Sequence, residues 1–119
     1  MDIELIEARD AATEAAIMTV GERALLDEVC GHCPDPRTGR AARLTQFWTA
    51  KEAVAKAEGT GFGGRAHQFV VERVDGDRLL VRSGRDNAHS RTRWVRTAMG
   101  AAPEPYALAW TEGGETDDA

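Results

Sequence analysis

The sequence predicts one α+β domain in which a long central helix packs on a mainly antiparallel sheet. Two observations predict this fold class. Residues 40–58 contain no glycine or proline and are rich in alanine, lysine and glutamate, all of which favour a helix. After them the apolar pattern changes to short runs separated by turn residues, which is typical of a β-meander. In a chain of 119 residues we expect one domain over residues 1–112 and a disordered acidic tail over residues 113–119.

The first part of the chain is expected to form one short strand and two helices. Apolar residues alternate with acidic ones over Met1–Leu5, which predicts the end of a strand. A short alanine-rich helix should begin at residues 10–13. Thr19 and Glu22 have the spacing of a capping box, which predicts a further helix that ends near Val29.

Residues 30–39 are rich in proline and glycine and are expected to form a loop. Within them, Cys30 and Cys33 form a Cys-x-x-Cys pair. A redox pair normally follows a strand and opens a helix, but here a helix is expected before it. A structural zinc site needs four ligands, and only His32 accompanies the two cysteines. We interpret the pair as incidental, with a redox or zinc module as the minor alternative, and expect the main helix over Arg40–Glu58.

Four strands are expected in the second half. His67–Val74 and Arg78–Ser83 flank the turn Asp75–Asp77 and predict a hairpin. Two further strands are expected over Arg91–Met99 and Tyr106–Trp110. One strand, then helices, then consecutive strands is the order expected of an α+β domain with an antiparallel sheet.

Composition excludes several classes of function. The formal net charge of −5 argues against general nucleic-acid binding. No apolar run approaches the roughly 20 residues that a membrane-spanning helix needs, and the N-terminus does not resemble an export signal. We therefore expect a cytoplasmic protein without a membrane or nucleic-acid partner.

One stripe of the main helix carries chemically useful side chains. Trp48, Glu52 and Lys56 are four residues apart, so they line up along one side of a helix. A carboxylate and an ammonium one turn apart can hold a metal ion and a phosphate together. The simpler interpretation is an exposed Glu–Lys pair, which contributes only about 0.3 kcal/mol.

Three motifs connect this helix to a known family. Residues 48–56 read Trp-x-x-Lys-Glu-Ala-x-x-Lys, and Gly-Thr-Gly follows at residues 59–61. Residues 2–4 read Asp-Ile-Glu, and residues 18–22 read Met-Thr-Val-Gly-Glu. In this order the motifs resemble those of the 4′-phosphopantetheinyl transferases, and the strand at residues 106–109 is similar to the closing strand of that family.

The resemblance implies a reaction and a set of site residues. The family moves the phosphopantetheine arm of coenzyme A, as co-substrate, onto a serine of an acyl or peptidyl carrier protein, and releases 3′,5′-ADP. By motif position, Asp2, Glu4 and Glu52 would bind Mg²⁺, a hard ion that prefers oxygen ligands. Glu52 and Lys56 would be catalytic: Glu52, or a metal-bound water near Glu4, would accept the serine proton, and Lys56 would contact the phosphates. Lys51 is the second-choice contact to the phosphates of coenzyme A, although it points about 100° away from Glu52 on the helix. The backbone around Gly59–Gly61 would approach the nucleotide closely.

The chain combines features of two branches of the family. Its motifs are those of the longer, two-halved branch, whereas its length is that of the holo-acyl-carrier-protein synthase branch, which forms trimers with sites between subunits. It also resembles the C-terminal transferase domain of some polyketide synthases. We expect a homo-oligomer, a trimer ahead of a dimer, in which Arg93 or Arg96 reaches the coenzyme A of a neighbouring copy. The alternative is a carrier-binding half-domain without turnover, which needs a missing N-terminal half or a partner subunit.

Overall fold

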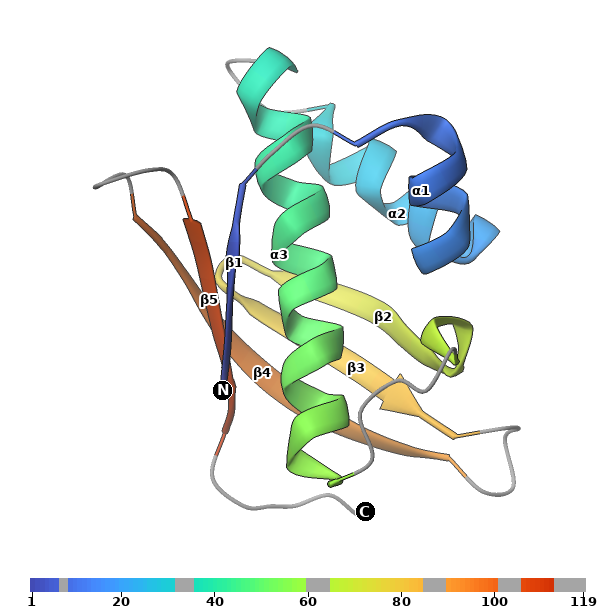
Figure 1. The fold of residues 1–119 in the computed structure, drawn as a ribbon, viewed down its shortest axis with the longest axis vertical. Helices are drawn as coiled ribbons and strands as arrows, with labels where there is room; N and C mark the ends of the chain where they lie inside the picture. Colours follow the sequence, from blue (N-terminus) through green and yellow to red (C-terminus); the bar gives the residue numbers. More distant parts are fainter. Residues whose placement is uncertain (7–8, 32–35, 60–64, 85–89, 101–105, 113–119) are drawn as a thin grey trace.

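A computed structural model describes residues 1–6, 9–31, 36–59, 65–84, 90–100 and 106–112. Three helices and five strands form the domain (Figure 1). In chain order they are β1 (Asp2–Leu5), α1 (Ala11–Ile17), α2 (Val20–Cys30), α3 (Pro36–Ala57), β2 (Phe69–Asp75), β3 (Arg78–Ser83), β4 (Arg91–Gly100) and β5 (Tyr106–Thr111). A 3-10 turn over Ala66–Gln68 precedes β2. The α+β fold predicted from the sequence is confirmed.

The strands make one antiparallel sheet in the order β1-β5-β4-β3-β2. Strands β2 to β5 follow one another as a meander. Strand β1 comes from the start of the chain and completes the sheet beside the last strand, with Asp2 opposite Ala109 and Glu4 opposite Ala107. This pairing places the first residues of the chain at one edge of the sheet, next to α3 (Figure 1).

The helix boundaries follow local capping chemistry, with one difference from the sequence prediction. The Thr19 side chain accepts a hydrogen bond from the Glu22 backbone, and the Glu22 side chain accepts one from the Thr19 backbone, so the predicted capping box is confirmed. Helix α3 begins at Pro36 rather than near Arg40, and α2 includes Cys30, so the expected loop over residues 30–39 is wrong for its first residue and its last four. Proline is well tolerated in the first turn, where a backbone N–H has no helical partner.

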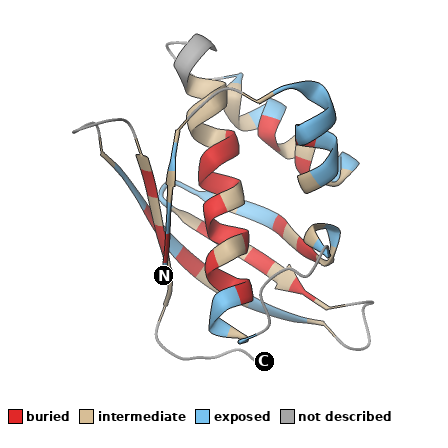
Figure 2. Ribbon diagram, in the orientation of Figure 1, coloured by how far each residue is buried: buried red, intermediate tan, exposed pale blue. Residues whose placement is uncertain are grey.

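The core lies between α3 and one face of the sheet (Figure 2). Buried residues of α3 include Phe47, Ala50, Ala53 and Val54, and they form one apolar cluster with buried residues of the strands. The strands contribute Phe69, Val71, Leu79, Val81, Val95 and Ala109. Alanines on α3 and β5 have small side chains, so the helix can lie close to the strand that positions β1.

The polar contacts of α3 show which face of the sheet it covers. Gln46 donates a hydrogen bond to Thr97 of β4 (2.9 Å), and Glu58 accepts one from Ser83 of β3. Side chains at alternate positions along these strands therefore face the helix. Arg96, next to Thr97, lies on the other face and pairs there with Glu112. No helix within the described residues is long and apolar enough to cross a membrane.

Candidate active site

Two carboxylate side chains of strand β1 point toward α3. Successive side chains of a strand point to opposite faces, so Asp2 and Glu4 share one face and Ile3 lies on the other. Their partners across β5, Ala107 and Ala109, are both buried. Asp2 is buried and Glu4 half-buried, whereas Ile3 is 61% exposed. The pairing with β5 thus fixes which residues of this short strand face the helix.

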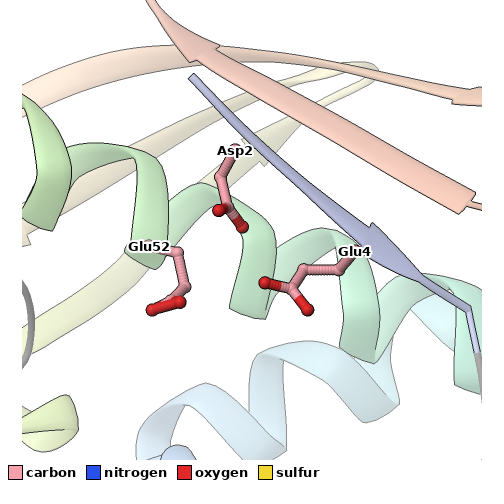
Figure 3. A group of neighbouring side chains, drawn as sticks. All are labelled: Asp2, Glu4 and Glu52. Carbon is pink, nitrogen blue, oxygen red and sulfur yellow. The ribbon is translucent and has the colours of Figure 1, made fainter.

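Helix α3 supplies a third carboxylate and a cation. Glu52 faces β1, and one oxygen from each of Asp2, Glu4 and Glu52 lies within 4.8 Å of the others (Figure 3). One helical turn further along, the ammonium Nζ of Lys56 donates a hydrogen bond to Oδ1 of Asp2 at 2.5 Å. Two segments about 50 residues apart in the sequence therefore meet in one cluster of charged groups.

The two oxygens of Asp2 have different surroundings. Oδ1 accepts the hydrogen bond from Lys56, whereas Oδ2 is buried and has no hydrogen-bond partner among the described residues while Glu4 is ionised. A buried carboxylate oxygen without a partner is costly, and a bound cation would satisfy it.

The cluster fits a hard divalent ion such as Mg²⁺. Its donor atoms are all carboxylate oxygens, which Mg²⁺ prefers. Around an octahedral Mg²⁺, adjacent oxygens are about 3.0 Å apart and opposite oxygens about 4.2 Å apart, so the three oxygens, which lie within 4.8 Å of one another, would move closer together to bind the ion. Glu52 and the exposed Lys56 leave one side of the cluster open to a ligand.

The crowding of carboxylates changes their proton affinities. Burial, a hydrogen bond with Asp2 and the negative charges of Asp2 and Glu52 raise the pKa of Glu4 to about 7, against the opposing effect of Arg9. Burial and the charge of Asp2 also raise the pKa of Glu52, which Lys56 partly offsets. A carboxylate whose pKa lies closer to neutrality is better suited to accept a proton at physiological pH.

Comparison with known proteins identifies the family. A family model for the 4′-phosphopantetheinyl transferase superfamily matches residues 1–111. The chain belongs to this superfamily. Neither the comparison with curated proteins nor the comparison with solved structures gave a match. The reaction class of the family is the transfer of a phosphopantetheine group, and the family resemblance predicted from the motifs is confirmed.

Lys51, which was predicted to bind coenzyme A, does not face the carboxylate cluster. Lys51 has no exposed surface, and its ammonium pairs with the buried carboxylate of Glu22 at 2.8 Å. It also donates a hydrogen bond to the backbone carbonyl of Ile17. Adjacent helical residues point about 100° apart, so Glu52 faces β1 while Lys51 faces α1 and α2. This position contradicts the prediction that Lys51 contacts the phosphates.

Lys56, also predicted to contact coenzyme A, lies at the carboxylate cluster, whereas the two predicted arginines lie away from the carboxylates of the same chain. Arg93 and Arg96 lie on opposite faces of β4, because they are three positions apart in the strand. Arg96 pairs with Glu112 on the face away from α3. Arg93 is on the α3 face, but roughly 13 Å along the strand from Thr97, which lies in the same row as Asp2. Its Nε is buried without a hydrogen-bond partner among the described residues. Gly61 lies outside the described residues.

The Cys-x-x-Cys pair is only partly described. Cys30 is half-buried and is the last residue of α2, whereas a reactive redox thiol commonly lies at a helix N-terminus. Cys33 and His32 lie outside the described residues.

Sequence reasoning missed the long-range partners of Glu22. The capping motif identified its local hydrogen bond, but a buried lysine 29 residues later gives no local signal. The adjacent lysine and glutamate of the helix motif were a partial clue, since two neighbouring charged residues on a packed helix cannot both face the same site.

Proposed function

We propose that this chain transfers the phosphopantetheine arm of coenzyme A to a serine of an acyl or peptidyl carrier protein, with Mg²⁺ as the metal. The observation that carries this proposal is the convergence of Asp2, Glu4 and Glu52 beside Lys56, with one buried oxygen of Asp2 left for a cation. Phosphoryl transfer depends mainly on alignment and charge neutralisation, and the residues of this cluster supply both.

Each residue has a specific task in the reaction. The three carboxylates would hold Mg²⁺, which would supply positive charge against the pyrophosphate. Lys56, whose side chain is 56% exposed, turns its ammonium toward a phosphate. Glu52 would accept the serine proton. The serine oxygen bonds to the phosphorus that carries the pantetheine arm, the bond from that phosphorus to the nucleotide breaks, and 3′,5′-ADP leaves.

The site is proposed to form between copies of the chain, in a trimer ahead of a dimer. The described residues bring three carboxylates and Lys56 together in one copy, and Arg9 is close enough to oppose the raised pKa of Glu4. A further arginine from a neighbour would supply a planar, two-pronged phosphate donor. Since Arg93 and Arg96 lie on opposite faces, only one of them can face a given neighbour's site. Arg93 is the better candidate, because Arg96 already pairs with Glu112, and the backbone at Gly61 is proposed to approach the nucleotide.

Mixing inactive variants tests the shared site. Asp2→Ala removes a metal ligand, and Arg93→Ala removes the donor proposed to act on the neighbour. A mixture of the two should regain part of the wild-type rate, because some interfaces would combine an intact carboxylate cluster with an intact arginine. No recovery in mixed oligomers, whose formation is verified by native mass spectrometry, would place both residues outside a shared site.

Metal removal separates the two candidate functions. A transferase should modify a carrier protein in the presence of coenzyme A and Mg²⁺ and stop when EDTA removes the metal. A carrier-binding half-domain should bind the carrier with or without metal and leave it unmodified. The carboxylate cluster favours the transferase, because a binding module does not need to assemble three carboxylates around one point.

A further inference from the structure

A buried ion pair lies directly behind the carboxylate cluster. Glu22 of α2 and Lys51 of α3 are both completely buried, and their charged atoms are 2.8 Å apart. Glu22 accepts two further hydrogen bonds, from the backbone N–H of Thr19 to Oε1 at 2.9 Å and from that of Val71 to Oε2 at 2.8 Å. Every charged atom of this pair is therefore occupied within the protein, and none is left for a substrate.

The hydrogen bonds of the pair join four elements. Lys51 connects α3 to the last carbonyl of α1, that of Ile17. Glu22 connects α2 to β2 through the N–H of Val71, next to the irregularity in the β2–β3 register between Val71 and Arg73. Because β2 is an edge strand, Glu22 also occupies a donor that would otherwise have no partner in the sheet.

Stability alone is a poor explanation for such a pair. Removing two charges from water is costly, and well-packed apolar residues of similar volume often stabilise a protein equally well. What a buried, fully hydrogen-bonded pair does impose is one arrangement of the elements it joins. Here it fixes how far α3 is rotated about its own axis, since Lys51 is held from the side of α1 and α2.

The rotation of α3 sets the position of a metal ligand. Glu52 follows Lys51 immediately and projects about 100° away from it, toward β1. A rotation of the helix by about 10° would displace a carboxylate roughly 6 Å from the axis by about 1 Å. Displacement on this scale degrades metal binding and catalysis, because site residues must be held within about 0.5 Å.

We propose that Glu22 and Lys51 are positioning residues for the metal centre, which hold α3 so that Glu52 completes the carboxylate cluster with Asp2 and Glu4. This inference rests on the proposed function, because it requires that the cluster binds a metal ion. The lysine and glutamate of the helix motif thereby have different tasks: the lysine faces inward and orients the helix, and the glutamate faces the ion.

The double variant Glu22→Gln/Lys51→Met tests this role without leaving an unpaired buried charge. We expect it to remain folded by circular dichroism and to bind Mn²⁺, the probe for the site, about tenfold more weakly than the wild type in a calorimetric titration. Loss of groups that orient metal ligands typically has an effect of this size. Glu22→Asp keeps the charge but shortens the side chain, and it should also weaken Mn²⁺ binding. This variant replaces the double variant in the test if the double variant does not fold.

Glu14→Gln is the matched control. Glu14 is also a buried carboxylate that joins helices, through Arg23 and Arg40, but Arg40 lies about three turns of α3 before Glu52. We expect this variant to lose thermal stability and to keep the wild-type Mn²⁺ dissociation constant within about twofold. If the role of Glu22 and Lys51 is purely structural, their variants should behave like Glu14→Gln: they should lose thermal stability and keep the wild-type Mn²⁺ dissociation constant.

The outcomes separate this inference from the proposed function. Weaker Mn²⁺ binding in the double variant or Glu22→Asp, with unchanged binding in Glu14→Gln, supports the positioning role. Wild-type Mn²⁺ affinity in a folded double variant, or in Glu22→Asp if only that variant folds, overturns it and leaves the proposed function intact. Absence of Mn²⁺ binding by the wild type overturns both.

Discussion

Protons and Mg²⁺ should compete for Glu4. Burial and its two carboxylate neighbours raise the pKa of Glu4 to about 7, so this side chain changes its charge within the physiological range. A carboxylate must be ionised to coordinate a metal. We therefore predict that lowering the pH from 8 to 6 weakens Mg²⁺ binding to the protein.

The size of this effect follows from the pKa. A group with a pKa of about 7 is roughly 90% ionised at pH 8 and roughly 10% ionised at pH 6. If only the ionised form binds, the apparent dissociation constant for Mg²⁺ should be about tenfold larger at pH 6 than at pH 8. Binding at pH 6 should also release nearly one proton per ion.

Isothermal titration calorimetry at both pH values, in buffers of different ionisation enthalpy, measures the affinity and the proton release together. Glu4→Gln is the control: it should bind Mg²⁺ more weakly at both pH values and lose most of the pH dependence. A wild-type affinity that changes less than twofold between pH 6 and pH 8, without proton release, would refute the reasoning about the cluster.

The same shift predicts how stability depends on pH in the absence of metal. The pKa of Glu4 is higher in the folded protein than its ordinary value of 4.5, so the folded state binds the proton more tightly than the unfolded state. The resulting stabilisation is complete below pH 4.5 and is lost as the pH rises through about 7. The melting temperature should fall over this range in the presence of EDTA and fall less in Glu4→Gln.

Three further predictions follow from single residues. Asp2→Ala and Glu52→Gln should each lower the transfer rate at least about a hundredfold, since each loses several kcal/mol of charge neutralisation; wild-type rates at limiting Mg²⁺ in a steady-state assay would contradict this. Gly100→Ala should displace the ring of Tyr106, which lies 2.4 Å from where the new Cβ would be, and lower the unfolding free energy by about 1 kcal/mol; unchanged ring proton shifts and unchanged urea denaturation would contradict it. Cys30→Ser should leave the transfer rate within about twofold, whereas a large loss would favour a thiol or zinc function.

Local chemistry made much of the fold predictable. The capping box of Thr19 and Glu22, and the hairpin around Gly76, depend on residues a few positions apart, and the structure contains both. The start of α3 was less predictable, because proline is as compatible with a loop as with a first helical turn, where Pro36 lies. The bounds of strands β3 to β5 followed from their apolar runs to within one residue.

The site was predictable only where family motifs supplied the long-range information. No local pattern indicates that Asp2 meets Glu52, and that proximity comes from the pairing of β1 with β5 under α3. Local helical geometry placed Lys51 about 100° from Glu52 but did not identify its buried partner, Glu22. The depth to which a lysine is buried depends on which elements pack around it, and this is a property of the complete fold.

Intact-mass measurement of a carrier protein tests the central claim most directly. An apo acyl or peptidyl carrier protein is incubated with the full chain, coenzyme A and Mg²⁺, alongside a carrier whose acceptor serine is replaced by alanine. The account predicts that the first carrier gains the mass of one phosphopantetheine arm and that the second gains none. An unmodified serine carrier, with a folded chain that binds both the carrier and Mg²⁺, would contradict it.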